Sequence, residues 1–231
     1  MNHTLILSLA SACALGAVSC SKPGGEATSP AVADGIPLKT ELPMEIIEGT
    51  PKDVSKIPNL DANTKPAPIS VPKDAVLLSK DKAVTSSDKG EPFEGELKYV
   101  TDGSKNGYEG YSVIIGEGPQ WVQIDLGASA TVDGMVLWHY FKNDRVVNDV
   151  IVQVSDDPEF KTGVTTLYNS DTDNTCGQGA GTDKAYIGTF LGKQIPGKAS
   201  KGRYVRTWSN GSTDNKMNEF IEVEVWGRAA R

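Results

Sequence analysis

The sequence predicts an all-β protein, a sandwich or jelly roll, for the part of the chain from Asp74 onward. Several short segments there alternate apolar and polar residues with a period of two, which is typical of strands with one buried face. These segments are separated by stretches rich in Gly, Asp, Asn and Ser, the residues that favour turns. No stretch shows a convincing helical stripe of apolar side chains. Many short strands joined by turns favour two packed β-layers.

Three segments alternate most regularly, and in each we expect the apolar side chains to face the core. Their inward residues are Val122, Ile124 and Leu126 in 120–126, Val150, Val152 and Val154 in 148–155, and Ile221, Val223 and Val225 in 219–226. In the last segment, Glu222 and Glu224 face the opposite side. Further strands are expected at 97–101, 111–115, 131–141, 164–168, 185–190 and 203–208.

The N-terminus has the pattern of a signal peptide. Residues 4–18 are almost entirely apolar or small, and Cys20 follows shortly after them. The stretch is shorter than the ~20 apolar residues that a transmembrane helix needs. The sequence Ala-Val-Ser before Cys20 resembles the end of a bacterial lipoprotein signal, which implies removal of residues 1–19 and a lipid on Cys20. Cys13 is a weaker alternative position, and an ordinary secretory signal with an incidental Cys is the other interpretation.

The remaining cysteine, Cys176, has no partner after such processing. The sequence therefore predicts neither a disulfide framework nor a cysteine-based metal site. A bystander role for Cys176 is expected.

Residues 20–73 are predicted to be a Pro-rich tether that precedes a folded domain at 74–231. Residues 21–73 hold nine of the 13 prolines and none of the 16 aromatic residues. Such a stretch buries too little apolar surface to offset the entropy lost on ordering, and its prolines make it extended. Within it, only 42–47 is expected to dock on the domain.

The acidic balance excludes some partners. The formal net charge is −7, and no run of Lys and Arg reverses it locally. Such a chain repels nucleic acid and anionic membrane surfaces, so we expect no nucleic-acid partner and no membrane contact other than through the lipid.

Five motifs occur in order and together resemble the discoidin family, also called the coagulation-factor type C domain, which includes the family-32 carbohydrate-binding modules. They are LKYVTDG at 97–103, WVQIDLG at 121–127, VIVQVS at 150–155, RYVR at 203–206 and IEVEVWG at 221–227. The resemblance covers about residues 75–228. It implies an eight-stranded antiparallel jelly-roll sandwich, a ligand site in the loops at one end, and often a structural Ca²⁺. Bacterial members mostly bind sugars, and some animal members bind phospholipid or protein, so the fold alone does not decide the ligand.

The resemblance also implies where a structural calcium ion would bind. Asp102 and Glu222 match family positions that supply carboxylates, helped by loop carbonyls around 104–107. Ca²⁺ takes six to eight oxygen ligands, which suits such an acidic loop. The alternative is a turn-forming Asp-Gly and a solvent-facing strand residue. A second acidic stretch, 171–183, lacks the closing Glu of an EF-hand and is interpreted as a surface loop.

The sequence favours a binding protein over an enzyme. His139 is the only His left after processing, and its segment holds no nucleophile motif. The chain has no Gly-rich phosphate loop and no HExxH. A pair of carboxylates for glycoside hydrolysis is the remaining catalytic alternative, yet nothing places two of them across a cleft.

Sugars present apolar ring faces and hydroxyl edges, so a sugar site needs an aromatic ring and a few planar polar groups. Polar and aromatic residues gather where predicted strands end. The candidate ligand-binding residues are His139, Tyr140, Asn143, Arg145, Trp208 and Asn210, and Tyr108 and Tyr111 flank a Gly-rich loop. In sugar-binding relatives a His, an Arg and an Asn contact the sugar. The alternative is that the aromatic residues are core and Arg145 forms an ordinary salt bridge.

These observations predict a non-catalytic carbohydrate-binding module, displayed on the cell envelope by a lipid on Cys20. No Asp follows Cys20, so the outer membrane is the expected location. The alternative function is a structural or protein-adhesion domain that uses the same loops. Phospholipid binding is a third interpretation, which the acidic charge disfavours.

Overall fold

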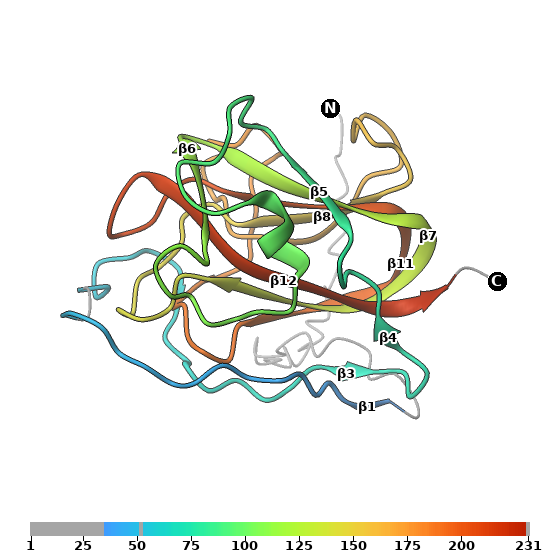
Figure 1. The fold of residues 1–231 in the computed structure, drawn as a ribbon, viewed down its shortest axis with the longest axis horizontal. Coiled ribbons are helices and arrows are strands. Elements are labelled where there is room, and N and C mark those ends of the chain that lie inside the picture. The colour runs from blue at the N-terminus through green and yellow to red at the C-terminus, as the bar shows by residue number, and fades with distance from the viewer. Residues whose placement is uncertain (1–34, 51–52, 230–231) are drawn as a thin grey trace, which may run out of the picture. The chain divides into compact units, whose positions relative to one another are not determined.

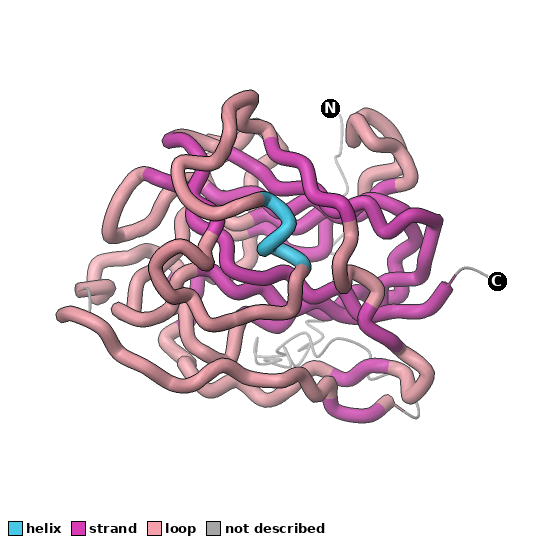
Figure 2. Tube along the Cα trace, viewed as in Figure 1, coloured by secondary structure: helices cyan, strands magenta, loops and turns pink. Residues whose placement is uncertain are grey.

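The computed structural model describes residues 35–50 and 53–229, which are almost entirely strand and loop (Figures 1 and 2). Residues 1–34, 51–52 and 230–231 lie outside the described part, and with them the predicted signal peptide and Cys20. Within the described ranges, no helix is both long enough and apolar enough to cross a membrane.

Eight antiparallel strands form the sandwich, as the family resemblance implies. They are β4 (Val76–Leu77), β5 (Ala83–Ser86), β6 (Val113–Glu117), β7 (Gln120–His139), β8 (Ile151–Ser155), β9 (Thr165–Asn169), β11 (Lys193–Ser209) and β12 (Met217–Ala229). The order β4-β12-β7-β11-β8-β9 runs through the hydrogen-bonded ladder, with β5 also paired to β7 and β6 to β12.

Strand β7 joins the two layers because it bends and contributes to both. Its first half pairs with β5, its second half pairs with β12, and β11 follows it along both halves. The two predicted strands at 120–126 and 131–141 are therefore one strand. Strands β7 and β11 are antiparallel, so Gln120 pairs with Ser209 and Leu137 pairs with Lys193. Both strands bend back at the same place (Figure 1), so both ends of each strand lie at the same end of the sandwich.

The predicted inward residues fill the main core, with one exception. Val122, Ile124, Leu126, Val150, Val152, Val154, Val223 and Val225 are all buried in a single cluster. Ile221 is the exception, because the pairing of β12 with β7 shifts register between Phe220 and Glu222. This β-bulge turns Ile221 to the other face of the sheet, where it packs in a second cluster.

The strand predicted at 97–101 is wrong: these residues form the 3₁₀-helix η1, Leu97–Thr101, the cyan segment of Figure 2. Its β-branched and aromatic residues favour a strand in isolation. Here Gly95 turns the chain with a φ of +73° before the helix, and Val100 is buried in the main core. Thr101 is buried as well, and its hydroxyl donates to the Lys82 carbonyl. Packing therefore overrides the local preference.

Part of the predicted tether lies on the sandwich. We call residues 35–50 and 53–73 the N-terminal arm (blue to teal in Figure 1). Its strand β1 (Ile36–Pro37) pairs with β3 (Ser70–Val71), and its strand β2 (Leu60–Asp61) pairs in parallel with β10 (Ala185–Tyr186). The strand expected at 185–190 is thus only two residues long.

The arm docks through residues other than those expected. Leu38 and Val71 are buried in the second cluster, whose sandwich residues include Val136 and Trp138 of β7. The stretch 42–47, expected to dock, leaves Met44 73% exposed. The arm therefore covers part of the outer face of β7 and β12, where the Thr40 hydroxyl donates to buried Glu224 at 2.8 Å. Buried Glu222 instead contacts the loop that follows η1, through the Gly103 N–H.

Candidate functional site

Five connections between strands begin and end at one end of the sandwich, which we call the loop end. They span 87–112, 118–119, 140–150, 170–192 and 210–216, and they include η1 and β10. Five of the six predicted ligand-binding residues lie in these loops or at the last residue of the strand that leads into them. The sixth, Trp208, is one residue before the end of β11.

His139 was predicted to contact a ligand, but it is buried in the core, so this prediction is wrong. The side chain is buried, its Nδ1 is 3.0 Å from the Tyr186 hydroxyl, and its ring packs against Phe220. Among the described residues, His139 Nε2 has no hydrogen-bond partner. Burial lowers the pKa of His139 to about 4, so the imidazole is neutral near pH 7.

Arg145 and Asn143 form a buried network, which is the alternative that the sequence left open. The guanidinium donates to Asn143 Oδ1 at 2.8 Å, to Glu219 Oε2 at 3.1 Å and to Asp214 Oδ2 at 2.7 Å. Its face covers the ring of Tyr140 at 4.2 Å. Arg145 is buried and uses at least three of its five N–H donors within the protein, so we interpret it as a residue that holds loops together.

Trp208 lies on the outer face of β11. Its indole N–H donates to Gln153 Oε1 at 3.1 Å, and its ring packs edge-on against Trp121. The guanidinium of Arg206 lies 4.1 Å from the centre of the Trp121 ring and 4.1 Å from that of Phe160. The predicted contact of Trp208 with a ligand at the loop end therefore has no support in its position.

A polar cleft of about 370 Å³ opens at the loop end, and Asn210 is the predicted residue that lines it. Its other lining residues are Glu117, Gly118, Asn148, Ser212, Asn215 and Lys216. Amide, hydroxyl, ammonium and carboxylate groups thus face one space. Asn210 Nδ2 also donates to Asp149 Oδ2 at 2.8 Å, which fixes the orientation of its amide.

Asn218, which sequence reasoning missed, holds the walls of this cleft in place. Its buried side chain donates to the carbonyls of Gly116 and Gly118, at 2.6 and 2.8 Å. Its Oδ1 accepts from the Ser209 hydroxyl at 2.7 Å and from the Gly211 N–H at 3.0 Å. One amide therefore connects two loops. Only its place in an otherwise apolar alternation could have indicated this role.

Asp102 and Glu222, the predicted cation ligands, lie near enough for the charge of Asp102 to act on Glu222. The N–H of Gly103 donates to Glu222 Oε2 at 2.9 Å, while Glu222 Oε1 is buried without a hydrogen-bond partner among the described residues. Burial, together with the neighbouring Asp102 carboxylate, raises the pKa of Glu222 to about 8. A buried carboxylate with one unpaired oxygen fits a hard cation. Lys105, 2.7 Å from Glu224, neutralises the other buried acid.

A second group of carboxylates consists of Asp149, Asp171 and Asp173, whose oxygens lie within 4.8 Å of one another. Both Asp171 oxygens accept backbone bonds, from Thr175 at 3.0 Å and Cys176 at 2.8 Å. These bonds show that Asp171 stabilises the backbone of its own loop, so the three carboxylates need no metal ion to account for their proximity. Burial raises the pKa of the Cys176 thiol to about 12, so this cysteine stays protonated near pH 7.

Residues 99–207 match the family model described as "NedA-like, galactose-binding domain", an F5/F8 type C domain. No protein of the curated set matches the chain.

Solved structures similar to this chain include the CBM32 of AlyQ in complex with 4,5-unsaturated mannuronic acid, at 19% identity, covering 65% of this chain and 97% of that chain, with a TM-score of 0.46. Another is chitosan-binding module 1 of a chitosanase/glucanase from Paenibacillus sp. IK-5, at 26% identity, 66% and 99% coverage and a TM-score of 0.43. A third is CpGH89CBM32-5 from Clostridium perfringens in complex with GalNAc-β-1,3-galactose, at 15% identity, 65% and 99% coverage and a TM-score of 0.45.

Proposed function

We propose, on the premise that this β-sandwich belongs to the discoidin-like, galactose-binding family, that the protein is a non-catalytic carbohydrate-binding module. The observation that carries the proposal is the polar cleft at the loop end. Side chains of Asn148, Asn210, Ser212 and Lys216 offer it hydrogen-bond donors and acceptors of the kind that sugar hydroxyls need.

The cleft supports weak binding. Sugar hydroxyls already bond well to water, so each hydrogen bond to the protein contributes only ~0.5–1.5 kcal/mol net. A few such bonds, less the cost of association, give a free energy of about −4 to −6 kcal/mol, or millimolar to high-micromolar Kd. Many copies on one surface would raise the effective affinity through avidity.

Lys216→Ala tests the cleft, with Lys201→Ala as its matched control. Lys216 is exposed and lines the cleft, whereas Lys201 is exposed on β11 where it pairs with Thr131, away from the loop end. On a glycan array, Lys216→Ala is expected to weaken the signals of the wild-type protein by about fivefold, equivalent to one lost hydrogen bond. Lys201→Ala should leave them unchanged. Equal signals for both variants would remove the cleft from the proposal.

We also propose that a structural Ca²⁺ binds between Asp102 and Glu222. The unpaired Glu222 Oε1 supports this. The ion would hold the loop that follows η1 against β12 and would take no part in chemistry.

We further propose that a lipid on Cys20 displays the module on the cell envelope. The support is the sequence of the N-terminal region alone. A Cys20→Ala protein should be lost from the membrane fraction in detergent-free buffer, while the wild-type protein stays with it. Equal fractionation of the two would exclude the anchor.

A further inference from the structure

The N-terminal arm passes the loop end at Glu48. The Glu48 N–H donates to the Lys142 carbonyl at 2.7 Å, so the backbone of the arm is fixed here. The Glu48 carboxylate lies 2.8 Å from Lys142 Nζ and accepts from the Tyr140 hydroxyl at 3.4 Å. The side chain of Glu48 remains 49% exposed. A carboxylate from outside the predicted domain is thus held at its binding end and still accessible.

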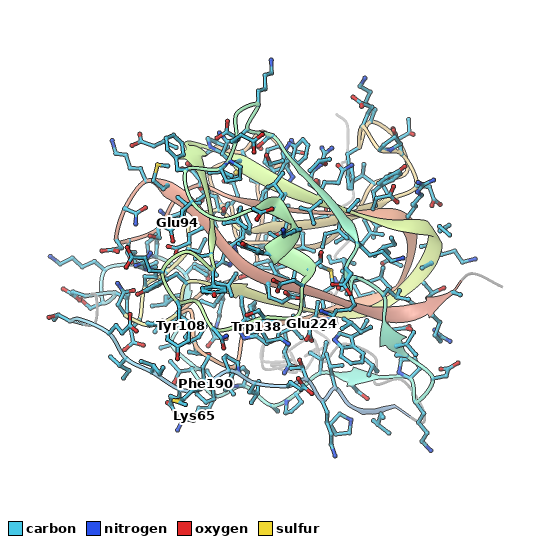
Figure 3. All side chains as sticks on the ribbon, in the orientation of Figure 1. Lys65, Glu94, Tyr108, Trp138, Phe190 and Glu224 are labelled. Atoms are coloured by element: carbon cyan, nitrogen blue, oxygen red, sulfur yellow. The ribbon has the colours of Figure 1, made fainter. Side chains whose placement is uncertain are left out.

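Lys142 is buried in spite of its charge, with only 1% of its surface exposed. Its ammonium lies between the Glu48 carboxylate and the face of the Tyr108 ring, 4.4 Å from the ring centre. Tyr108 itself is 45% exposed, and Figure 3 labels it at the edge where the arm passes. The cation is therefore satisfied within the protein and is closed to an anionic ligand.

The guanidinium of Arg145, next to this site, is also engaged within the protein, because it is paired with Asp214 and Glu219. Tyr140, which contacts Glu48, also lines a small hollow with Arg145 and Ser212. Ser212 in turn lines the polar cleft, so the hollow adjoins the cleft, and the Tyr140 hydroxyl connects the hollow to Glu48. Glu48 and Tyr108 are both partly exposed on this side of Lys142.

We propose that Glu48 and Tyr108 form a second sugar subsite, beside the hollow that adjoins the cleft, and that this subsite selects uncharged saccharides over uronic acids. This inference rests on the proposed function. A carboxylate accepts charge-assisted hydrogen bonds from two adjacent hydroxyls of one sugar, and an aromatic face packs on the apolar face of the ring. A uronic acid would instead bring its own carboxylate next to the exposed carboxylate of Glu48. The Lys142 ammonium is buried and already paired with Glu48, so it is not available to the incoming charge.

Glu48→Gln in the full chain tests the proposal, with Glu41→Gln as the control. Glu41 is an exposed acid of the same arm, seven positions away. Three pairs of monosaccharides that differ at C6 serve as probes: galactose and galacturonate, glucose and glucuronate, mannose and mannuronate. NMR titration gives the affinity for each.

The wild-type protein is expected to bind the neutral member of at least one pair and to bind its uronate more weakly. Glu48→Gln should reduce this preference about tenfold, because it removes the like charge and weakens the bonds to the neutral sugar. Glu41→Gln should retain the wild-type preference. A role in stability alone would change melting temperature without changing the ratio of the two affinities. Tyr108→Phe should bind as wild type and Tyr108→Ala more weakly, since the ring is what the subsite uses.

An unchanged ratio in Glu48→Gln, or a wild-type preference for a uronate, would overturn the subsite. If Lys216→Ala still weakens binding in that case, the proposed function stands without it. If no saccharide of the glycan array binds the wild-type protein, the proposed function fails and the subsite fails with it.

Discussion

Arg145 illustrates how the partners of a single residue determine whether it can bind a ligand. An arginine in a loop next to aromatic rings is typical of a residue that contacts sugar. In this structure, however, Asn143, Asp214 and Glu219 already accept its hydrogen bonds. Sequence spacing places such residues in a loop, but it does not give the long-range partners. Asp214 and Glu219 lie 69 and 74 positions away in the chain.

Arg145→Ala is expected to destabilise the protein by roughly 3 kcal/mol, because it removes a buried cation from two largely shielded acids, Asp214 and Glu219. Arg203→Ala is the comparison, since its pair with Asp125 is partly exposed and should contribute no more than about 1 kcal/mol. Urea unfolding of both variants gives the two values. Similar small losses would show that the Arg145 network is not structural.

His139 gives a pH dependence of stability with a defined sign. Its pKa is about 4 in the folded protein and about 6.5 when unfolded, so the unfolded state binds more protons between these values. The stability that comes from the neutral, buried ring is present above pH 6.5 and is lost as the pH falls toward 4. The pKa difference corresponds to roughly 3 kcal/mol.

Melting curves of wild type and His139→Gln between pH 7 and pH 4 test this expectation. The difference between the two proteins should shrink as the pH falls, because only the wild type loses stability through this ring. A difference that does not change with pH would contradict the buried, neutral state of His139.

At the scale of elements, the period-two alternation of apolar and polar residues predicted the buried strands, but it did not predict the β-bulge or the short helix. The inward residues of 120–126 and 148–155 could be predicted because period-two patterns report directly on burial. The bulge at Ile221 could not, because a register shift depends on pairing with β7. The strand predicted at 97–101 failed for a related reason, since a turn at Gly95 and burial of Val100 impose η1.

The contacts of the N-terminal arm also could not be predicted from the sequence. Its composition, rich in Pro and without aromatic rings, predicted a tether, and its extended course agrees with that composition. Its contacts depend on isolated apolar residues such as Leu38 and Val71, which meet Trp138 only in the folded protein. Composition averages over a segment and therefore misses such single anchors.

Leu38→Ala should destabilise the docked arm, while Leu42→Ala should not. Leu38 is buried in the second cluster, and truncating a buried Leu costs about 2–5 kcal/mol. Leu42 is 49% exposed and should change stability by no more than about 0.5 kcal/mol. Limited proteolysis with analysis of cleavage sites in residues 35–73 measures the difference. Equal cleavage rates for the two variants would show that Leu38 does not anchor the arm.

For the whole molecule, a bound Ca²⁺ would add stability because it binds only the folded state. The gain is about 2.7 kcal/mol when the ion is at 100 times its Kd. Chelator should therefore lower the melting temperature, and Glu222→Gln should abolish this response. Asp171→Asn, in the second acidic group, should leave the response in place. An identical melt of wild type with and without chelator would exclude the ion.

Calorimetric titration of the purified full chain with a broad saccharide panel, including galactose-containing oligosaccharides, tests the central claim most directly. The proposed function predicts heat of binding with at least one saccharide, with Kd in the millimolar to high-micromolar range and no turnover of the sugar. No heat with any saccharide, together with recovery of a specific protein partner by the same loops, would contradict it and favour the adhesion function instead.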